Sequence, residues 1–462
     1  MKKILSVVLI LVMCAALALT TGCNKTGDTD DKKTSSVTIE NIYGSSELTQ
    51  EQIAAFQNSG EITLYTTEPE LAKGEYDDEA KEYHDWLKKY YGLTIKYKFQ
   101  AYGDDLTKFM VDYAAEKAPD YISLNYRRWP KAGTRQIVYT VRELEEKGIV
   151  GLDHPQMKQY ADLQAPFCIG GECYSPIAYY CNPVVVAVNT DLYKKFQVKS
   201  PVEYYKEGNW NMDTFIKCCE EISRTEPNGT KYWGVAGWNY SWYLVANDAR
   251  LITWDDNDNL VLTMTDKATV DTLEMWQDMN VNGYSPSAQD SAAINPFGTG
   301  IQGMKLYTAN NHAQELPDVS FNWDIVPMPY GDNNTSGLVP GEISGSGIVT
   351  SSKNVQGIIN YLIAERVWND AQRGEKSLYL PDTYEGVYND EQIALIQSYC
   401  DKVDQDIYMG VGNINSHHWK FWDDIKAGMD IKTAIETYEP VWQVQVDEEN
   451  ANFAKAKAEK NK

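Results

Sequence analysis

The stretch that most constrains the fold of this chain runs from Cys173 to Arg224. It holds two apolar, β-rich runs separated by Pro183, and the second run, 184–188, leads to a helix start at Asn189. Proline has no backbone N–H, so it interrupts the hydrogen-bond ladder of a strand. A chain that leaves one sheet and enters another is expected to show this pattern. The sequence therefore predicts two sheets joined by this crossing.

A helix is predicted shortly after the crossing. Its apolar residues recur at helical spacing, at Met212, Phe215, Ile216, Cys219 and Ile222. Asn211 comes just before them and has the short polar side chain that favours the N-cap position.

The chain before the crossing alternates short strands and helices. Strands are predicted at 62–65, 93–99 and 121–124, and helices around 80–90 and 106–113. This order is typical of a parallel sheet with helices on both faces, in which ligands bind at the carboxyl ends of the strands. Those ends are the loops at 66–68, 102–104 and 125–129.

Three motifs in the central stretch resemble a known family. They are Y-x-P before the crossing, V-x-x-N-T-D-L-Y-x-x-F after it, and G-N-W-N-M-D-T-F at the predicted helix start. They are similar to motifs of the extracellular solute-binding proteins of ABC importers, in the carbohydrate-binding group that includes maltose-binding protein. The segments 295–311 and 324–331 resemble further motifs of that family, with Gly303 in place of its alanine.

The resemblance implies an α/β fold of the two-lobed, periplasmic-binding-protein-like (Venus flytrap) type. Each lobe is expected to be a mainly parallel sheet flanked by helices, and a hinge is expected to join the lobes. The implied division is a signal peptide at 1–22, a disordered tether at 23–36, an N-terminal lobe at 37–182 and 336–400, and a C-terminal lobe at 183–335 with helices and tail at 401–462.

The N-terminus has the pattern of a targeting segment. Lys2 and Lys3 precede an apolar run at 4–19 that is too short for a stable membrane span. Small residues before Cys23 resemble the bacterial lipobox, although Thr20 stands where the family has leucine. The resemblance implies that Cys23 is lipidated and anchors the protein to the extracellular face of the bacterial cell membrane. The alternative is a plain secretory peptide with Cys23 as a leftover thiol.

Charge and missing motifs exclude several classes of protein. The formal net charge of −24 at pH 7 argues against nucleic-acid binding, which depends on clustered lysine and arginine. The sequence has no P-loop, no G-x-S-x-G, no G-x-G-x-x-G after a strand and no zinc motif. We expect a monomer that is not an enzyme and that needs no cofactor or metal.

Aromatic residues point to the kind of ligand. The chain has 32 Tyr and 13 Trp, and such rings pack against the flat C–H faces of pyranoses while amides and carboxylates bind the hydroxyls. For any single ring, packing inside the protein is about as good an explanation. From strand ends and the resemblance, the residues expected to face the ligand are Glu68, Asn125, Arg128, Trp129, Tyr180, Trp238, Trp242, Tyr307, Asn310 and Glu342.

Two smaller features leave alternatives open. The segment 168–173 is predicted to be a hairpin with a Gly-Gly turn, so Cys168 and Cys173 become cross-strand neighbours that either form a disulfide or stay reduced. The run 417–419, His-His-Trp, either binds a metal, lines a cleft or lies on a surface helix, and the last interpretation is favoured.

The resemblance implies a non-enzymatic binding protein. It would capture an extracellular carbohydrate, an oligosaccharide in our interpretation, between its lobes and deliver it to the permease subunits of an ABC transporter. One alternative is the same fold binding a peptide or an anion, or serving a sensor system. Another is a surface enzyme that acts on glycans, which would require a pair of suitably spaced carboxylates.

Overall fold

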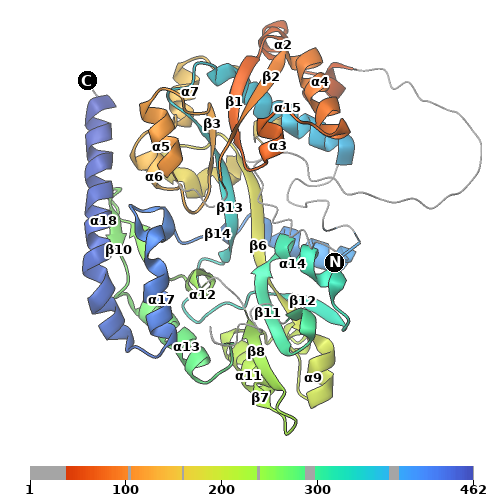
Figure 1. Ribbon diagram of the computed structural model, residues 1–462, viewed down its shortest axis with the longest axis vertical. Helices are drawn as coiled ribbons and strands as arrows, with labels where there is room; N and C mark the ends of the chain where they lie inside the picture. Colours follow the sequence, from red (N-terminus) through yellow and green to blue (C-terminus); the bar gives the residue numbers. More distant parts are fainter. Residues whose placement is uncertain are drawn as a thin grey trace, which may run out of the picture. The chain divides into compact units, whose positions relative to one another are not determined.

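A computed structural model describes residues 38–101, 106–158, 161–236, 240–286, 297–373, 384 and 386–460 (Figure 1). They form two compact units. The first takes in the chain up to Ser123, with Val138–Ala161 and Gly347–Glu375, and the second comprises Leu124–Ile137, Asp162–Ser346 and Lys376–Lys462. The predicted signal peptide, tether and lipidation site lie outside the described residues.

The lobe boundaries implied by the resemblance remain a prediction. They assign Leu124–Ile137 to the N-terminal lobe, whereas this segment packs as part of the second unit. The chain therefore enters the second unit at Leu124, leaves it after Ile137 and returns at Asp162.

The first unit is built around a β-α-β element, as predicted. Strand β1 (Gly60–Thr66) pairs in parallel with β2 (Leu93–Phe99), and α4 (Asp78–Tyr91) connects them. The Asp77 carboxylate caps α4 by accepting a hydrogen bond from the Ala80 N–H at 2.8 Å. Other elements of this unit are α1 (Ile39–Tyr43), α2 (Gln50–Gln57), α3 (Pro69–Ala72), α5 (Thr107–Ala114), β3 (Tyr121–Leu124), α7 (Val141–Glu146), α8 (Pro155–Lys158) and α15 (Val355–Arg373).

The second unit contains a larger, mixed sheet. Its strands lie in the order β14 (Val403–Asp404), β13 (Val339–Ile348), β6 (Ala178–Asn189), β11 (Gln302–Thr308), β8 (Lys231–Ala236) and β7 (Arg224–Thr225), and β12 (Trp323–Pro327) also pairs with β6. Strand β6 runs antiparallel to β13, β11 and β12, while β11 and β8 are parallel. The sheet of this unit was expected to be mainly parallel. That expectation is wrong in this respect, because the longest strand, β6, is antiparallel to three partners.

The crossing predicted at Pro183 lies within one continuous strand. Strand β6 is 12 residues long, and its partner changes at Pro183. Gly341 of β13 lies opposite Pro183, and Thr308 of β11 lies opposite Val184. Figure 1 shows β13 beside the first half of β6 and β11 beside the second half. The missing N–H of Pro183 thus falls where one ladder ends and the next begins.

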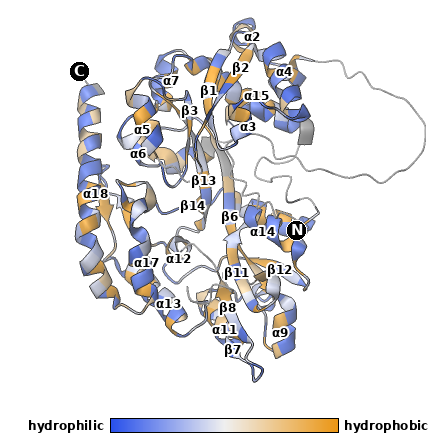
Figure 2. Cartoon of the chain, in the orientation of Figure 1, coloured by the Kyte–Doolittle hydropathy of each residue, from blue (hydrophilic) through white to orange (hydrophobic). Residues whose placement is uncertain are grey.

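Both faces of β6 are buried in its second half. Val184, Val186 and Val188 belong to one hydrophobic core, and Val185 and Ala187 belong to another on the opposite face. Alternation of side chains along a strand produces this division. Figure 2 shows hydrophobic residues along β6 and β8, and more hydrophilic residues along α18.

Helices surround this sheet. The predicted helix at 212–222 is α11 (Met212–Ile222), and the Asn211 carboxamide oxygen caps it by accepting from the Thr214 N–H at 3.0 Å. The other helices of the unit are α6 (Lys131–Thr134), α9 (Thr190–Phe196), α10 (Pro201–Lys206), α12 (Ser241–Ala246), α13 (Lys267–Val281), α14 (Ala309–Glu315), α16 (Asp390–Cys400), α17 (His418–Lys426) and α18 (Ile431–Lys460). Strands β9 (Ile252–Trp254) and β10 (Leu260–Leu262) form a separate hairpin.

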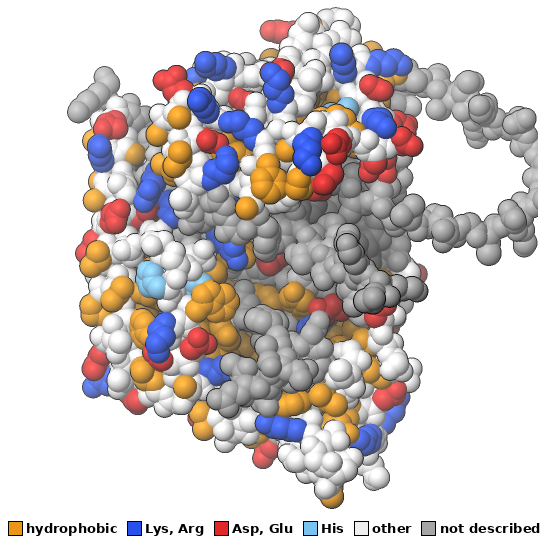
Figure 3. All heavy atoms as spheres, in the orientation of Figure 1, with side chains coloured by type: hydrophobic (Ala, Val, Ile, Leu, Met, Phe, Trp, Pro, Cys, Tyr) orange, Lys and Arg blue, Asp and Glu red, His pale blue; other side chains and the backbone are white. Residues whose placement is uncertain are grey.

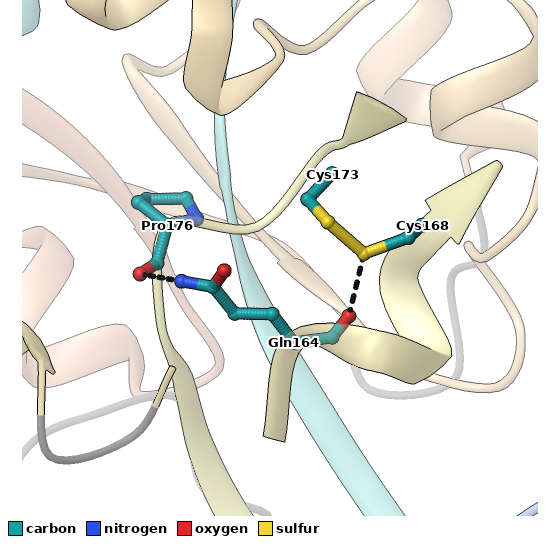
Figure 4. Close-up of a disulfide and its surroundings, with 4 residues drawn as sticks. All are labelled: Gln164, Cys168, Cys173 and Pro176. Atoms are coloured by element: carbon teal, nitrogen blue, oxygen red, sulfur yellow. Dashed lines mark hydrogen bonds between the residues drawn. A yellow bond between two sulfur atoms is a disulfide. The ribbon is translucent and has the colours of Figure 1, made fainter. Parts of the chain in front are cut away.

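The hairpin at 168–173 is closed by a disulfide. Strands β4 (Cys168–Ile169) and β5 (Glu172–Cys173) pair so that Cys168 lies opposite Cys173, and their sulfurs are bonded. Figure 4 shows Gln164 facing this disulfide, while its side-chain amide donates to the carbonyl of Pro176 at 2.6 Å. The alternative that the sequence left open is settled in favour of the bridge.

Candidate functional site

Asn182 is the centre of a buried polar cluster in the second unit. It lies on β6 directly opposite Glu342 of β13, and its side chain is 1% exposed. Its carboxamide oxygen accepts a hydrogen bond from the backbone N–H of Asn310 at 3.0 Å. Asn310 lies in the first turn of α14, directly after β11. Two residues expected to face the ligand, Asn310 and Glu342, are therefore joined through a third that the prediction omitted.

Arg127 adds a positive charge to this cluster. Burial raises the pKa of Glu342, while the hydrogen bond with Asn182 and the positive charge of Arg127 partly offset that shift. Glu342 keeps part of its surface exposed. A carboxylate that is hydrogen-bonded to an amide and stabilised by the charge of a guanidinium is suited to accept hydrogen bonds from the hydroxyls of a ligand.

Asn125 shapes the loop that carries Arg127. Its side-chain oxygen accepts from the Arg127 N–H at 3.1 Å, and its carbonyl accepts from the N–H groups of Arg128 and Trp129, both at 2.9 Å. The Arg127 guanidinium lies 5.3 Å from the centre of the Tyr126 ring. Arg128 is partly exposed in the same loop.

Trp129 is buried in the second unit, and Glu68 belongs to the first unit. The Trp129 ring is 1% exposed and packs against Phe167 and Tyr174, with ring centres 5.7 Å apart in each case. In this structure it is a core residue of the second unit. Glu68 is exposed at the N-cap position of α3 in the first unit. Burial of its carboxyl raises its pKa, with added effects from Asp77 and Glu70.

Trp242 and Tyr307 form the first part of an aromatic group. Their ring centres are 6.4 Å apart, Trp242 is 4% exposed and Tyr307 is partly exposed. The Lys305 ammonium lies 4.9 Å from the centre of the Tyr307 ring. Trp242 also lines a cavity of about 20 Å³, together with Tyr240 and Trp276. That volume accommodates about one water molecule, so the cavity itself holds no sugar.

Trp419 is the exposed member of the aromatic group. It was not among the residues expected to face the ligand, and the run 417–419 was expected to lie on a surface helix, with a metal site or a cleft lining as alternatives. Its side chain is 48% exposed at the start of α17. Its ring centre lies 4.4 Å from His418 and 6.5 Å from Tyr240, and Tyr240 packs on Trp276 and Trp422 at 4.5 and 4.9 Å. Figure 3 shows histidine side chains next to hydrophobic ones on this face of the second unit.

His418 packs against Trp419 of the aromatic group. Burial lowers its pKa, and the nearby charge of Arg127 also lowers it, whereas hydrogen bonds to the backbone oppose this shift. Its Nδ1–H donates to the carbonyl of Asn415 at 2.9 Å. At neutral pH this imidazole is therefore uncharged, and its ring centre lies 4.4 Å from that of Trp419. Exposed aromatic surface and hydrogen-bonding groups thus occur in one region of the second unit.

The remaining predicted residues lie outside the described atoms. Trp238 belongs to the segment 237–239, and Tyr180 lies on β6 opposite Ser344, but its side chain is not described. Within the described ranges, no group of three or more His, Cys, Asp or Glu residues is placed to hold a metal ion. In the same part of the chain, no helix is both long and apolar enough to cross a membrane.

Comparison with known proteins identifies the family. Residues 65–367 match the family described as bacterial extracellular solute-binding protein. No curated protein sequence matches the chain significantly.

Solved structures with a similar fold are distant in sequence. An ABC substrate-binding protein from Listeria monocytogenes in complex with cycloalternan has a TM-score of 0.61 at 16% identity, covering 86% of this chain and 99% of that one. The galacto-N-biose-/lacto-N-biose I-binding protein of Bifidobacterium longum has 0.60 at 12% identity, covering 85% and 98%. UgpB from Mycobacterium tuberculosis, in complex with glycerophosphocholine, has 0.59 at 19% identity, covering 84% and 99%. These similarities support the α/β periplasmic-binding-protein-like fold.

Proposed function

This chain belongs to the bacterial extracellular solute-binding proteins, which are transport receptors and not enzymes, and on that basis we propose that its solute is a carbohydrate, with an oligosaccharide as the favoured form. The exposed ring of Trp419 beside Tyr240 carries this proposal. A pyranose ring has apolar C–H faces and polar edges, and it needs an aromatic surface next to hydrogen-bonding groups. Glu342, Arg127 and His418 supply such groups in the same unit.

The comparisons lend this proposal indirect support. The Listeria protein was solved in complex with cycloalternan, and the Bifidobacterium protein in complex with lacto-N-biose. Identities of 16% and 12% transfer the fold and not the ligand. The roles of the predicted site residues, including Trp238 and Tyr180, therefore remain proposals.

A second candidate is a phosphorylated solute. Arg127 and Arg128 are adjacent in one loop, and a guanidinium pairs well with phosphate. The M. tuberculosis protein, bound to glycerophosphocholine, shows that the fold accepts such a ligand. Because the charge of Arg127 already acts on the Glu342 carboxylate, it is partly compensated, and we favour the neutral sugar.

The proposed transport role has two further parts. The protein would deliver its sugar to the permease subunits of an ABC transporter, and a lipid on Cys23 would hold it at the outer face of the cell membrane. Family membership supports the first part, and the lipobox-like sequence supports the second. Mass spectrometry of the protein from its native membrane tests the lipid: an unmodified thiol at Cys23 contradicts it.

A thermal-shift screen tests the solute class. The protein beginning at Thr38 is heated with monosaccharides, oligosaccharides, glycerophosphocholine and short peptides. A ligand present at one hundred times its dissociation constant stabilises the fold by about 2.7 kcal/mol, which is visible as a shift of a few degrees. Stabilisation by one sugar class, with that sugar recovered unchanged, supports the proposal. Stabilisation by glycerophosphocholine or peptides alone overturns it.

A further inference from the structure

The segment Leu124–Ile137, here called the arm, belongs to the second unit through non-covalent contacts. The chain on both sides of it, up to Ser123 and from Val138, belongs to the first unit, whereas the arm packs in the second. The arm carries Arg127, whose charge acts on Glu342 and on His418. The position of Arg127 therefore depends on the contacts that hold the arm.

Trp129 makes the first of these contacts. Its ring is buried between Phe167 and Tyr174, and its backbone passes close to Gly410. A Cβ atom at Gly410 would come within 1.6 Å of the Trp129 carbonyl oxygen, so only glycine fits there. This contact holds the centre of the arm.

Glu449 makes the second contact. It lies on α18, and its side chain has no exposed surface. One of its oxygens accepts from the Thr134 hydroxyl at 2.5 Å and from Arg135 Nε at 3.2 Å, and the other accepts from Arg135 Nη2 at 3.1 Å. The Arg135 side chain is 27% exposed. A two-point pairing of this kind fixes direction as well as distance.

The pairing of Glu449 with Arg135 matters more for the orientation of the arm than for holding α18 in place. The helix already buries Trp442, Val446 and Phe453. Buried ion pairs often stabilise a fold no better than apolar residues of the same size, because removing two charges from water is costly. An apolar residue at position 449 would not select one orientation of Thr134 and Arg135, because it makes no hydrogen bonds to them.

We propose that Glu449 is a positioning residue for the ligand site, because its bonds to Thr134 and Arg135 hold the arm, and with it Arg127, in one orientation. Glu449 itself does not contact the ligand. The inference rests on the proposed function, since it assumes that Arg127 takes part in binding the solute.

A double-mutant cycle tests this role. The dissociation constant for the sugar found in the thermal-shift screen is measured by calorimetry for the wild type, Glu449→Gln, Arg127→Gln and the double variant, well below every unfolding midpoint. Glu449→Gln is expected to weaken binding about tenfold, and the double variant no more than Arg127→Gln alone. Glu448→Gln, an exposed neighbour on the same helix, is the matched control and is expected to bind as the wild type does.

Two outcomes of the cycle overturn the inference. If Glu449→Gln lowers only the unfolding midpoint and leaves the dissociation constant unchanged, Glu449 is merely structural. If its effect adds in full to that of Arg127→Gln, it does not act through Arg127. Thr134→Val, which removes one hydrogen bond to Glu449 and keeps the ion pair, replaces Glu449→Gln if that variant does not fold.

Hydrogen exchange separates this inference from the proposed function. Amides of the arm such as Ala132 and Arg135, bonded to the carbonyls of Arg128 and Lys131, are expected to exchange faster in Glu449→Gln than in Glu448→Gln, with no ligand present. If no sugar stabilises the wild type, the proposed function falls, and exchange alone decides whether Glu449 holds the arm. Unchanged exchange overturns that part as well.

Discussion

The backbone N–H of Asn310 donates a 3.0 Å hydrogen bond to the side-chain oxygen of Asn182, across 128 residues of sequence. This bond ties the start of α14 to the middle of β6, opposite Glu342. Asn182 therefore supports the position of both Asn310 and Glu342 in the polar cluster.

Replacing Asn182 by Leu is expected to lower the free energy of unfolding by about 1–3 kcal/mol, because the Asn310 N–H loses its acceptor in a buried place. Denaturant unfolding measures the change. Asn311→Ala is the control, because Asn311 bonds only locally, to the Thr308 hydroxyl at 2.8 Å, and a smaller loss is expected. Equal losses in the two variants would contradict a special role for Asn182.

Replacing Trp419 by Ala is expected to weaken sugar binding about tenfold and to change stability little, because its ring is 48% exposed. Trp422, on the same helix, is 1% exposed. Trp422→Ala is therefore expected to cost about 3–5 kcal/mol of stability through the cavity it leaves. Calorimetry measures the affinity of both variants, and thermal unfolding measures their stability. An unchanged affinity in Trp419→Ala would show that Trp419 is not part of the site.

Asp406 is expected to make stability depend on pH. Burial raises its pKa to about 6, although its carboxylate accepts from the N–H groups of Leu251 and Tyr408 at 2.7 and 3.1 Å. A raised pKa means that the folded protein binds the proton more tightly than the unfolded chain. The stabilisation is therefore complete below the unfolded pKa of about 3.9 and is lost as pH rises through the folded value.

The measurement compares the wild type with Asp406→Asn at two pH values. The difference in unfolding free energy is expected to change by about 2 kcal/mol in favour of the wild type between pH 7.5 and pH 4.5. Taking the difference between the two proteins cancels the pH-dependent contributions of all carboxyl groups that titrate alike in both. A difference that does not vary with pH would show that Asp406 has an ordinary pKa.

Removing the disulfide is expected to destabilise the protein moderately. Cys168 and Cys173 are five residues apart, so the bridge closes a short loop. Loop-closure entropy for such a loop corresponds to about 2 kcal/mol. Denaturant unfolding of the Cys168→Ser/Cys173→Ser variant gives the value. The wild type in a reducing agent should match the variant, and a protein insensitive to both would contradict the estimate.

Local patterns in the sequence were sufficient for most elements of the fold. The β-α-β order of the first unit follows from alternating runs, and Asn211 caps its helix because a cap depends on three or four neighbouring residues. The effect of Pro183 was harder to predict. The ladder partner of β6 changes there, so the missing N–H costs little and the strand continues.

The candidate site was less predictable, because its members come from distant segments. Glu342 and Asn310 were named in advance, but Asn182, which joins them, looks in the sequence like any strand residue. Trp129 follows a strand end and was expected to face the ligand, whereas it is buried and packs against Phe167 and Tyr174. The exposure of Trp419 depends on its neighbours in three dimensions, which no helical spacing reveals.

The four free cysteines in the described chain, at 181, 218, 219 and 400, are all buried. In a protein that begins at Thr38, no other cysteine lies outside the disulfide. A thiol introduced at the exposed Lys420, next to Trp419, would therefore react with a fluorophore while the native thiols stay covered. The natural sequence thus offers a ready scaffold for an optical reporter, whose emission would follow the arrival of the solute without prior removal of any native cysteine.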